Sequence, residues 1–124
     1  MAMRARVKVF FDGGFRPSPM GMETAVVVRG QSYVQRDLGP GSSMDAEWLA
    51  LLHAVAIAKE LGLSDPVFLG DSLAVIGQAN GTAKCRGAFV RHLEAMKAAS
   101  ASPHIRYVKR TQNLAGIALE RLHP

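Results

Sequence analysis

Cysteine is almost absent from this chain, which has Cys85 and no other cysteine among its 124 residues. A single thiol cannot form an internal disulfide and has no second cysteine at metal-binding spacing. The sequence therefore excludes a disulfide scaffold and a cysteine zinc site. A lone thiol also fits a reducing compartment, so we expect a cytoplasmic protein.

Long apolar segments are absent as well, and so are internal repeats, linkers and low-complexity tracts. No stretch approaches the roughly 20 apolar residues that cross a bilayer, so no membrane association is expected. The first residues, MAMRARVKVFF, begin with basic side chains, but their apolar run is short and lacks a small-residue cleavage site. They predict no signal peptide.

Acidic residues are the minority charge, with 10 Asp and Glu against 15 Lys and Arg, which gives a net charge of +5. The corresponding pI is about 9.9. Nucleic acid is a common partner of basic proteins, because phosphate contacts release counterions and supply much of the affinity. A dispersed charge excess also serves solubility alone, so the charge by itself leaves both interpretations open.

The rest of the composition is that of an ordinary globular protein, with 48% hydrophobic and 20% charged residues. A chain of this length removes about two thirds of its unfolded surface from water and needs only one core. We therefore predict a single domain over residues 1–124, which we expect to be a monomer.

Hydrophobic periodicity predicts strands over residues 6–12, 22–30, 31–37, 66–71 and 104–110, and helices over residues 44–62, 72–80, 88–101 and 113–123. Ser42 and Asp45 resemble a capping box before the first helix, and Gly62 suits its end. Three consecutive strands, followed by helices that alternate with strands, predict an α/β fold with a mixed sheet.

Three carboxylates stand at informative places in this pattern. Asp12 ends the first predicted strand, Asp71 ends the buried strand PVFLGD, and Glu47 lies in the first turns of the long helix beside its apolar face. Each has an ordinary interpretation: a turn residue for Asp12, a helix N-cap for Asp71 and a boundary residue for Glu47. Together they can converge at the carboxyl ends of the strands, where oxygen ligands suit Mg²⁺ or Mn²⁺.

Four stretches resemble, in order and spacing, the successive motifs of the type 1 ribonuclease H family: VFFDGG, SSMDAEWLALLHAVAIAKELG, FLGDSLAVIGQANG and VKRTQNLAGIALE. The resemblance covers almost the whole chain. It implies a ribonuclease H-like fold, with a five-stranded mixed sheet of three antiparallel strands and then parallel strands, flanked by helices. It also implies hydrolysis of the RNA strand of RNA/DNA hybrids with two Mg²⁺ ions.

The same resemblance implies roles for the three acids. Asp12 matches the aspartate that bridges both ions, and Glu47 and Asp71 match the acids that hold one of them, so all three are predicted catalytic and metal-binding residues. The fourth acid of the family falls on Gly116, so this ligand is missing. Glu120 lies one turn later, about 6 Å further along the helix. We therefore predict Mg²⁺ or Mn²⁺ as cofactor, with two ions or only one.

The residues that we predict to contact nucleic acid are Gly13, Gly14, Ser42, Ser43, Lys84, Arg86, Arg110 and Asn113. The glycines are expected to leave room for nucleic acid near the backbone. Lys84 and Arg86 have the alternative of solvated surface charge. The mobile histidine of the family has no match before Asn113; His104 is expected at the surface and His53 in packing.

We therefore expect a metal-dependent endoribonuclease that acts on RNA/DNA hybrids by a two-metal-ion mechanism, weakened by the missing acid. One alternative is a nucleic-acid-binding module that keeps the ribonuclease H fold with degraded catalysis. Another is a structural or interaction domain, which a basic face beside Asp12 would oppose.

Overall fold

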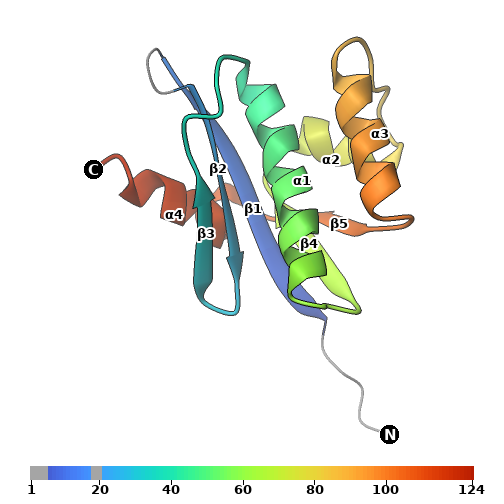
Figure 1. Ribbon diagram of the computed structural model, residues 1–124, viewed down its shortest axis with the longest axis horizontal. Coiled ribbons are helices and arrows are strands. Elements are labelled where there is room, and N and C mark those ends of the chain that lie inside the picture. Colours follow the sequence, from blue (N-terminus) through green and yellow to red (C-terminus); the bar gives the residue numbers. More distant parts are fainter. Residues whose placement is uncertain (1–5, 18–20) are drawn as a thin grey trace, which may run out of the picture.

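The computed structural model describes residues 6–17 and 21–124, so part of the N-terminal segment on which the signal-peptide expectation rests lies outside it. These residues form a five-stranded sheet flanked by helices (Figure 1). Its strands are β1 (Val7–Arg16), β2 (Gly21–Val28), β3 (Gln31–Gln35), β4 (Pro66–Gly70) and β5 (His104–Tyr107).

The strand order in the sheet is β3-β2-β1-β4-β5. β1, β2 and β3 pair antiparallel, whereas β4 pairs parallel to β1 and β5 parallel to β4. The predicted mixed sheet and element order are confirmed. The long helix between β3 and β4 supplies the crossover that a parallel strand requires.

The helices are α1 (Ser43–Glu60), α2 (Leu73–Asn80), α3 (Phe89–Ala99) and α4 (Leu114–Arg121), with a short 3-10 helix over Arg110–Gln112 before α4. Figure 1 shows α1 and α3 side by side on one face of the sheet and α4 apart from them. Among the described residues, no helix combines the length and apolar character that a membrane crossing needs.

Two apolar clusters fill the two faces of the sheet. The larger one packs α1 against the sheet around Phe11, Trp48 and Leu51, none of which is exposed. The smaller one packs Ala115 and Leu119 of α4 onto β2. Because side chains alternate along a strand, β1 contributes Phe11 to the first cluster and Phe10 to the second.

The start of α1 is fixed by the predicted capping box. The Ser42 hydroxyl accepts from the Asp45 amide at 3.0 Å, and the Asp45 carboxylate accepts from the Ser42 amide at 3.1 Å. At the other end, Gly62 has φ +65°, the left-handed conformation that stops the helix. Both ends of α1 were therefore predictable from local sequence.

β1 is longer than predicted, and the interpretation of Asp12 as the last strand residue is wrong. The strand continues to Arg16 because β2 pairs with it beyond Asp12, with Asp12 opposite Ala25 and Arg16 opposite Gly21. Parallel pairing with β4 extends only as far as Phe10. Asp12 therefore lies in mid-strand, just beyond the point where β1 and β4 separate.

Candidate metal centre

Asp12, Glu47 and Asp71 come together where β4 ends beside the middle of β1. Each offers one carboxylate oxygen, and these oxygens all lie within 4.8 Å of one another. Asp71 follows β4, and the parallel register that places Phe10 beside Leu69 brings it level with Asp12. Glu47 reaches the same point from the first turns of α1.

One oxygen of this cluster has no partner. Oε2 of Glu47 is buried and accepts no hydrogen bond from any described residue. A buried acceptor without a partner is costly, and three carboxylates at this distance repel one another when ionised. The unsatisfied oxygen, the spacing and the all-oxygen donor set fit a hard divalent cation such as Mg²⁺ or Mn²⁺.

The same crowding raises two pKa values. Burial, followed by the charge of Asp71, raises the pKa of Asp12 to about 6, although hydrogen bonding to Glu47 and the charge of Arg110 act in the opposite direction. Burial, followed by the charge of Asp12, raises the pKa of Glu47 to about 9. A cation favours the ionised carboxylates and would lower both values.

Asn113 ties one carboxylate of the cluster, Asp71, to the backbone of β1. Its Nδ2 donates to the Phe11 carbonyl and to Oδ2 of Asp71, each at 3.0 Å, and its Oδ1 accepts from the Ala115 amide at 3.1 Å. The side chain is fully buried. Each of its polar side-chain atoms is engaged inside the protein, and the predicted nucleic-acid contact of Asn113 stays a prediction.

Asp71 is not a helix N-cap, which was the ordinary interpretation of this residue from sequence. The N-cap of α2 is Ser72, whose hydroxyl accepts from the Val75 amide at 3.4 Å. The Asp71 side chain can therefore face the carboxylate cluster.

Gly116 faces the cluster from α4. A Cβ atom built on it would have Oδ2 of Asp12 as its nearest neighbour, at 3.3 Å. A side chain at this position would point at the site, but the chain supplies none. Glu120 is exposed and is not part of the group formed by the three clustered carboxylates.

A groove of about 860 Å³ opens over the carboxylates. It is lined by Asp12, Gly13, Gly14, Phe15, Arg16, Glu23, Ser43, Met44, Glu47, Asp71, Ser72, Ala74, Arg110, Thr111, Gly116, Ile117, Leu119 and Glu120. It opens where β1 continues past β4, so the edge that β4 leaves uncovered gives access to the cluster.

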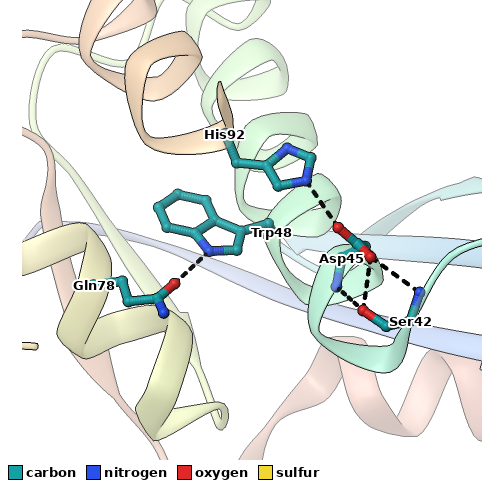
Figure 2. A network of polar contacts seen from close by, with 5 residues as sticks. All are labelled: Ser42, Asp45, Trp48, Gln78 and His92. Atoms are coloured by element: carbon teal, nitrogen blue, oxygen red, sulfur yellow. Dashed lines mark hydrogen bonds and ion pairs between the residues drawn. The ribbon is translucent and has the colours of Figure 1, made fainter. Parts of the chain in front are cut away.

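A polar network fixes the helix turn that carries Glu47 (Figure 2). Nε2 of His92, on α3, lies 3.2 Å from Oδ1 of Asp45, and the Trp48 ring stacks on His92 at 6.0 Å between centroids. Nε1 of Trp48 donates to Oε1 of Gln78 on α2 at 2.9 Å. Hydrogen bonds from Ser42, the largest cause, and from His92 lower the pKa of Asp45. Three helices therefore restrain the residues on either side of Glu47.

The two glycines behind Asp12 differ in what surrounds them. Gly13 is buried, and a Cβ atom there would overlap the Ala46 carbonyl of α1. The space beside its Cα atom is occupied by α1, but Gly13 still lines the groove, and its expected role of giving room to nucleic acid stays a prediction. At Gly14 a Cβ atom would meet only Leu119 and Glu23, at 3.9 and 4.0 Å, so a side chain is tolerated there and the expected role of Gly14 toward nucleic acid stays a prediction.

The other predicted nucleic-acid contacts lie at different distances from the cluster. Ser42 and Ser43 are exposed, but the Ser42 side chain is engaged in the capping box, whereas Ser43 lines the groove. Arg110 also lines the groove. Lys84 and Arg86 are exposed in the loop between α2 and α3, outside the groove lining.

Neither histidine considered from sequence reaches the cluster. His104 is exposed at the start of β5, away from the carboxyl ends of the strands. His53 has Nδ1 at 3.0 Å from the Thr24 hydroxyl, and burial lowers its pKa. The packing interpretation of His53 agrees with this environment.

Glu23 was missed. It is only 2% exposed and lines the groove beside Gly14. Its carboxylate lies 2.7 Å from Nε2 of His123 and 3.9 Å from a guanidinium nitrogen of each of Arg16 and Arg36. A charged residue within the apolar strand METAVVV was the available sequence signal.

The sheet order, the helix arrangement and the carboxylate cluster define a protein with the ribonuclease H-like fold. The sequence also matches the reverse transcriptase-like family over residues 21–121, and the chain belongs to this family. No curated protein matches the chain significantly.

Solved structures share the fold over nearly the whole chain. RNase H1 of the archaeon Halobacterium salinarum NRC-1 is 24% identical, with a TM-score of 0.81 over 93% of this chain and 94% of that one. The N-terminal RNase H domain of a Mycobacterium tuberculosis protein is 23% identical, with a TM-score of 0.74 over 93% and 95%. LC11-RNase H1, in complex with an RNA/DNA hybrid, is 18% identical, with a TM-score of 0.72 over 92% and 93%.

Proposed function

We propose that this protein is a divalent-cation-dependent endoribonuclease that hydrolyses the RNA strand of RNA/DNA hybrids. The observation that carries the proposal is the cluster of Asp12, Glu47 and Asp71, with its unpartnered Glu47 oxygen at the floor of an open groove. The structural likeness to an RNase H1 in complex with an RNA/DNA hybrid supports the substrate class.

In this proposal Asp12, Glu47 and Asp71 hold Mg²⁺ or Mn²⁺. A bound ion of this kind supplies a nucleophilic hydroxide at neutral pH and stabilises the leaving oxygen. Asn113 keeps the Asp71 carboxylate oriented through its 3.0 Å hydrogen bond. Arg110, which lines the groove and lowers the pKa of Asp12 by its charge, is placed to meet a backbone phosphate.

The finer proposal is a two-ion mechanism with reduced activity, because Gly116 leaves the fourth ligand position empty. A single-ion site made by the three acids is the alternative. Under either the two-ion or the single-ion mechanism, we expect the cleavage activity to depend on a divalent cation and to disappear in EDTA.

A second candidate function is favoured by Gly116 itself. Where a side chain would point at Asp12 the chain has none, which suits a nucleic-acid-binding module with degraded catalysis. An interaction domain unrelated to nucleic acid is disfavoured, because Arg16 and Arg110 line the groove that holds the carboxylates.

Cleavage of an end-labelled RNA/DNA hybrid in Mg²⁺, Mn²⁺ or EDTA tests the proposal. We expect RNA fragments with either ion, and a loss of about 100-fold or more in Asp12→Asn, which keeps the shape of the side chain but removes its charge. Asp65→Asn is the matched control, since Asp65 is exposed and pairs with Arg6 away from the groove.

The outcomes separate the candidates. Hybrid binding without cleavage under either ion would favour the binding module over the nuclease. Equal cleavage by Asp12→Asn and Asp65→Asn would remove the carboxylate cluster from the mechanism.

A further inference from the structure

We propose that Arg16 and Arg36, held in place by the buried carboxylate of Glu23, bind a backbone phosphate of the nucleic acid that occupies the groove beside Asp12. The inference rests on the proposed function, since it assumes that a nucleic-acid strand passes the carboxylates. It adds a second point of contact at the other end of the groove, which would fix the direction in which the strand runs.

Glu23 is a buried anion at the centre of this site. It lies on β2 opposite Gly14 of β1. On its other side it comes level with Arg36, because Thr24 pairs with Gln35 in the β2–β3 register. A carboxylate that is only 2% exposed costs several kcal/mol unless cations or hydrogen bonds compensate for its burial. His123, Arg16 and Arg36 surround Glu23 and supply this compensation.

The nearest partner of Glu23 is not an arginine. His123 of the C-terminal segment lies 2.7 Å and 2.9 Å from the two carboxylate oxygens. The Arg16 and Arg36 nitrogens lie at 3.9 Å, beyond hydrogen-bond distance. The carboxylate therefore orients the two guanidinium groups by charge without using up their donors.

Two guanidinium groups beside one carboxylate leave a positive excess. The Arg16 and Arg36 side chains are 41% and 44% exposed, so their free N–H groups are accessible from solvent. Guanidinium matches the geometry of phosphate oxygens and binds them through paired hydrogen bonds. Such a pair suits a phosphodiester better than a compact metal or an apolar ligand.

The pair is aligned with the carboxylate cluster. Alternate residues of a strand share a face, so Asp12, Gly14 and Arg16 point to the same side of β1. Four residues of strand place Arg16 about 13 Å from Asp12. Gly14, between them, contributes no side chain, and the groove is lined by all three. Within the described residues, a strand that crosses the carboxylates along this groove therefore reaches Arg16.

Acidic groups in the groove do not prevent a phosphate from binding at Arg16 and Arg36. A separation of about 13 Å exceeds the Debye length of about 8 Å at physiological ionic strength, so the carboxylates repel a phosphate at Arg16 only weakly. Glu120 also lines the groove, but it is exposed and water screens its charge. With phosphates spaced about 3.4 Å along the axis of one strand, the expected contact is a few nucleotides from the cleaved bond.

Equilibrium binding of an RNA/DNA hybrid in EDTA, where metal-dependent cleavage does not interfere, tests the site. The double variant Arg16→Gln/Arg36→Gln is compared with Lys59→Gln/Lys97→Gln, which removes the same charge from the last turns of α1 and α3. We expect the first to lose about tenfold or more in affinity and the slope of log K against log salt to fall by about 1 or more. We expect little change in the control.

Position is tested with hybrids that carry one neutral methylphosphonate linkage, moved along each strand in turn. For the wild type we expect one position to cost affinity well above the others. That cost should vanish in Arg16→Gln/Arg36→Gln, because the arginines and the phosphate then act as one interaction. The variant Arg16→Lys/Arg36→Lys, which keeps the charge, should retain most of the salt slope.

The outcomes keep this inference apart from the proposed function. Arginine-dependent binding without cleavage in Mg²⁺ or Mn²⁺ would reject the nuclease and support the phosphate site. Cleavage with equal salt slopes in both double variants, or with independent effects at every linkage, would overturn the phosphate site alone. Failure of the wild type both to bind the hybrid in EDTA and to cleave it in either ion would overturn both.

Discussion

Gly116 and Asp12 face each other across the groove: a Cβ atom at position 116 would lie 3.3 Å from Oδ2 of Asp12. Gly116 sits in the first turns of α4, whose N-cap Asn113 is itself bonded to Asp71. The helix is therefore anchored to the cluster at the very point where it offers no side chain. This relationship makes Gly116 the most informative position for testing the activity.

Gly116→Asp is expected to raise both cation affinity and hybrid cleavage, on the order of tenfold, because an added charged oxygen ligand tightens cation binding. The 3.3 Å approach requires Asp12 to shift by a few tenths of an ångström, which an exposed groove permits. Cation titrations followed by thermal unfolding, together with initial cleavage rates, measure the two effects. Gly116→Asn is the control of similar shape, and equal behaviour of the two variants would contradict a ligand role for this position.

Stability without a divalent ion should fall as pH rises. The pKa values of Asp12, about 6, and Glu47, about 9, lie above those of the unfolded chain, so the folded protein binds protons more tightly. Their contribution to stability is complete below about pH 4 and is lost as pH rises through the two folded-state values, at up to about 1.4 kcal/mol per pH unit for each proton released.

Thermal unfolding between pH 5 and pH 9 in EDTA checks this dependence. Glu47→Gln should flatten the decline that extends toward pH 9, and saturating Mg²⁺ or Mn²⁺ should offset it in the wild type, because a cation replaces the protons. Asp65→Asn should leave the profile unchanged, since Asp65 is an exposed acid outside the groove. A flat wild-type profile would show that the folded protein does not bind protons more tightly than the unfolded chain.

Asn113→Ala should lower stability and cation affinity together. It removes the N-cap of α4, worth about 1 kcal/mol, and leaves the Phe11 carbonyl and Asp71 short of a donor, at about 1–3 kcal/mol more. Asn80→Ala is the matched control, because Asn80 donates to the Ile105 carbonyl at 3.0 Å but has no contact with the carboxylates. If both variants lose stability and neither changes the cation response, Asn113 is only a structural residue.

Gly13→Ala and Gly14→Ala should differ sharply although the positions are adjacent. The added methyl group at Gly13 meets the Ala46 carbonyl and forces α1 away from β1, at a cost of about 1–3 kcal/mol or more. At Gly14 the nearest atoms are 3.9 and 4.0 Å away, so stability should change by less than about 0.5 kcal/mol. Urea denaturation of both variants measures the difference, and similar midpoints would be inconsistent with the close contact at Gly13.

Local patterns were sufficient for the element order and for the ends of α1. The Ser42–Asp45 box and Gly62 act through neighbours in the chain, so their effect is visible in sequence. The sequence also indicated that Asp12, Glu47 and Asp71 could meet, although Asp12 lies in mid-strand and is level with Asp71 through the parallel β1–β4 register. Their catalytic role stays a prediction, for which the geometry supplies the reason.

Long-range contacts account for what sequence did not reveal. Asp-Gly-Gly is typical of a turn, yet pairing with β2 carries β1 on to Arg16. Gly13 and Gly14 are chemically identical, and only the approach of α1 distinguishes them. Nothing local in the sequence indicates that Asn113 donates to the Phe11 carbonyl, 102 residues away.

That last hydrogen bond has a consequence for the order in which the site is assembled. Synthesis from the N-terminus produces β1, α1 and β4 long before Asn113, so a growing chain contains all three carboxylates but lacks the amide that orders them. Docking of α4 is therefore the step that supplies the amide donor to Asp71, and transient opening of this single helix would withdraw that donor while the sheet remains intact.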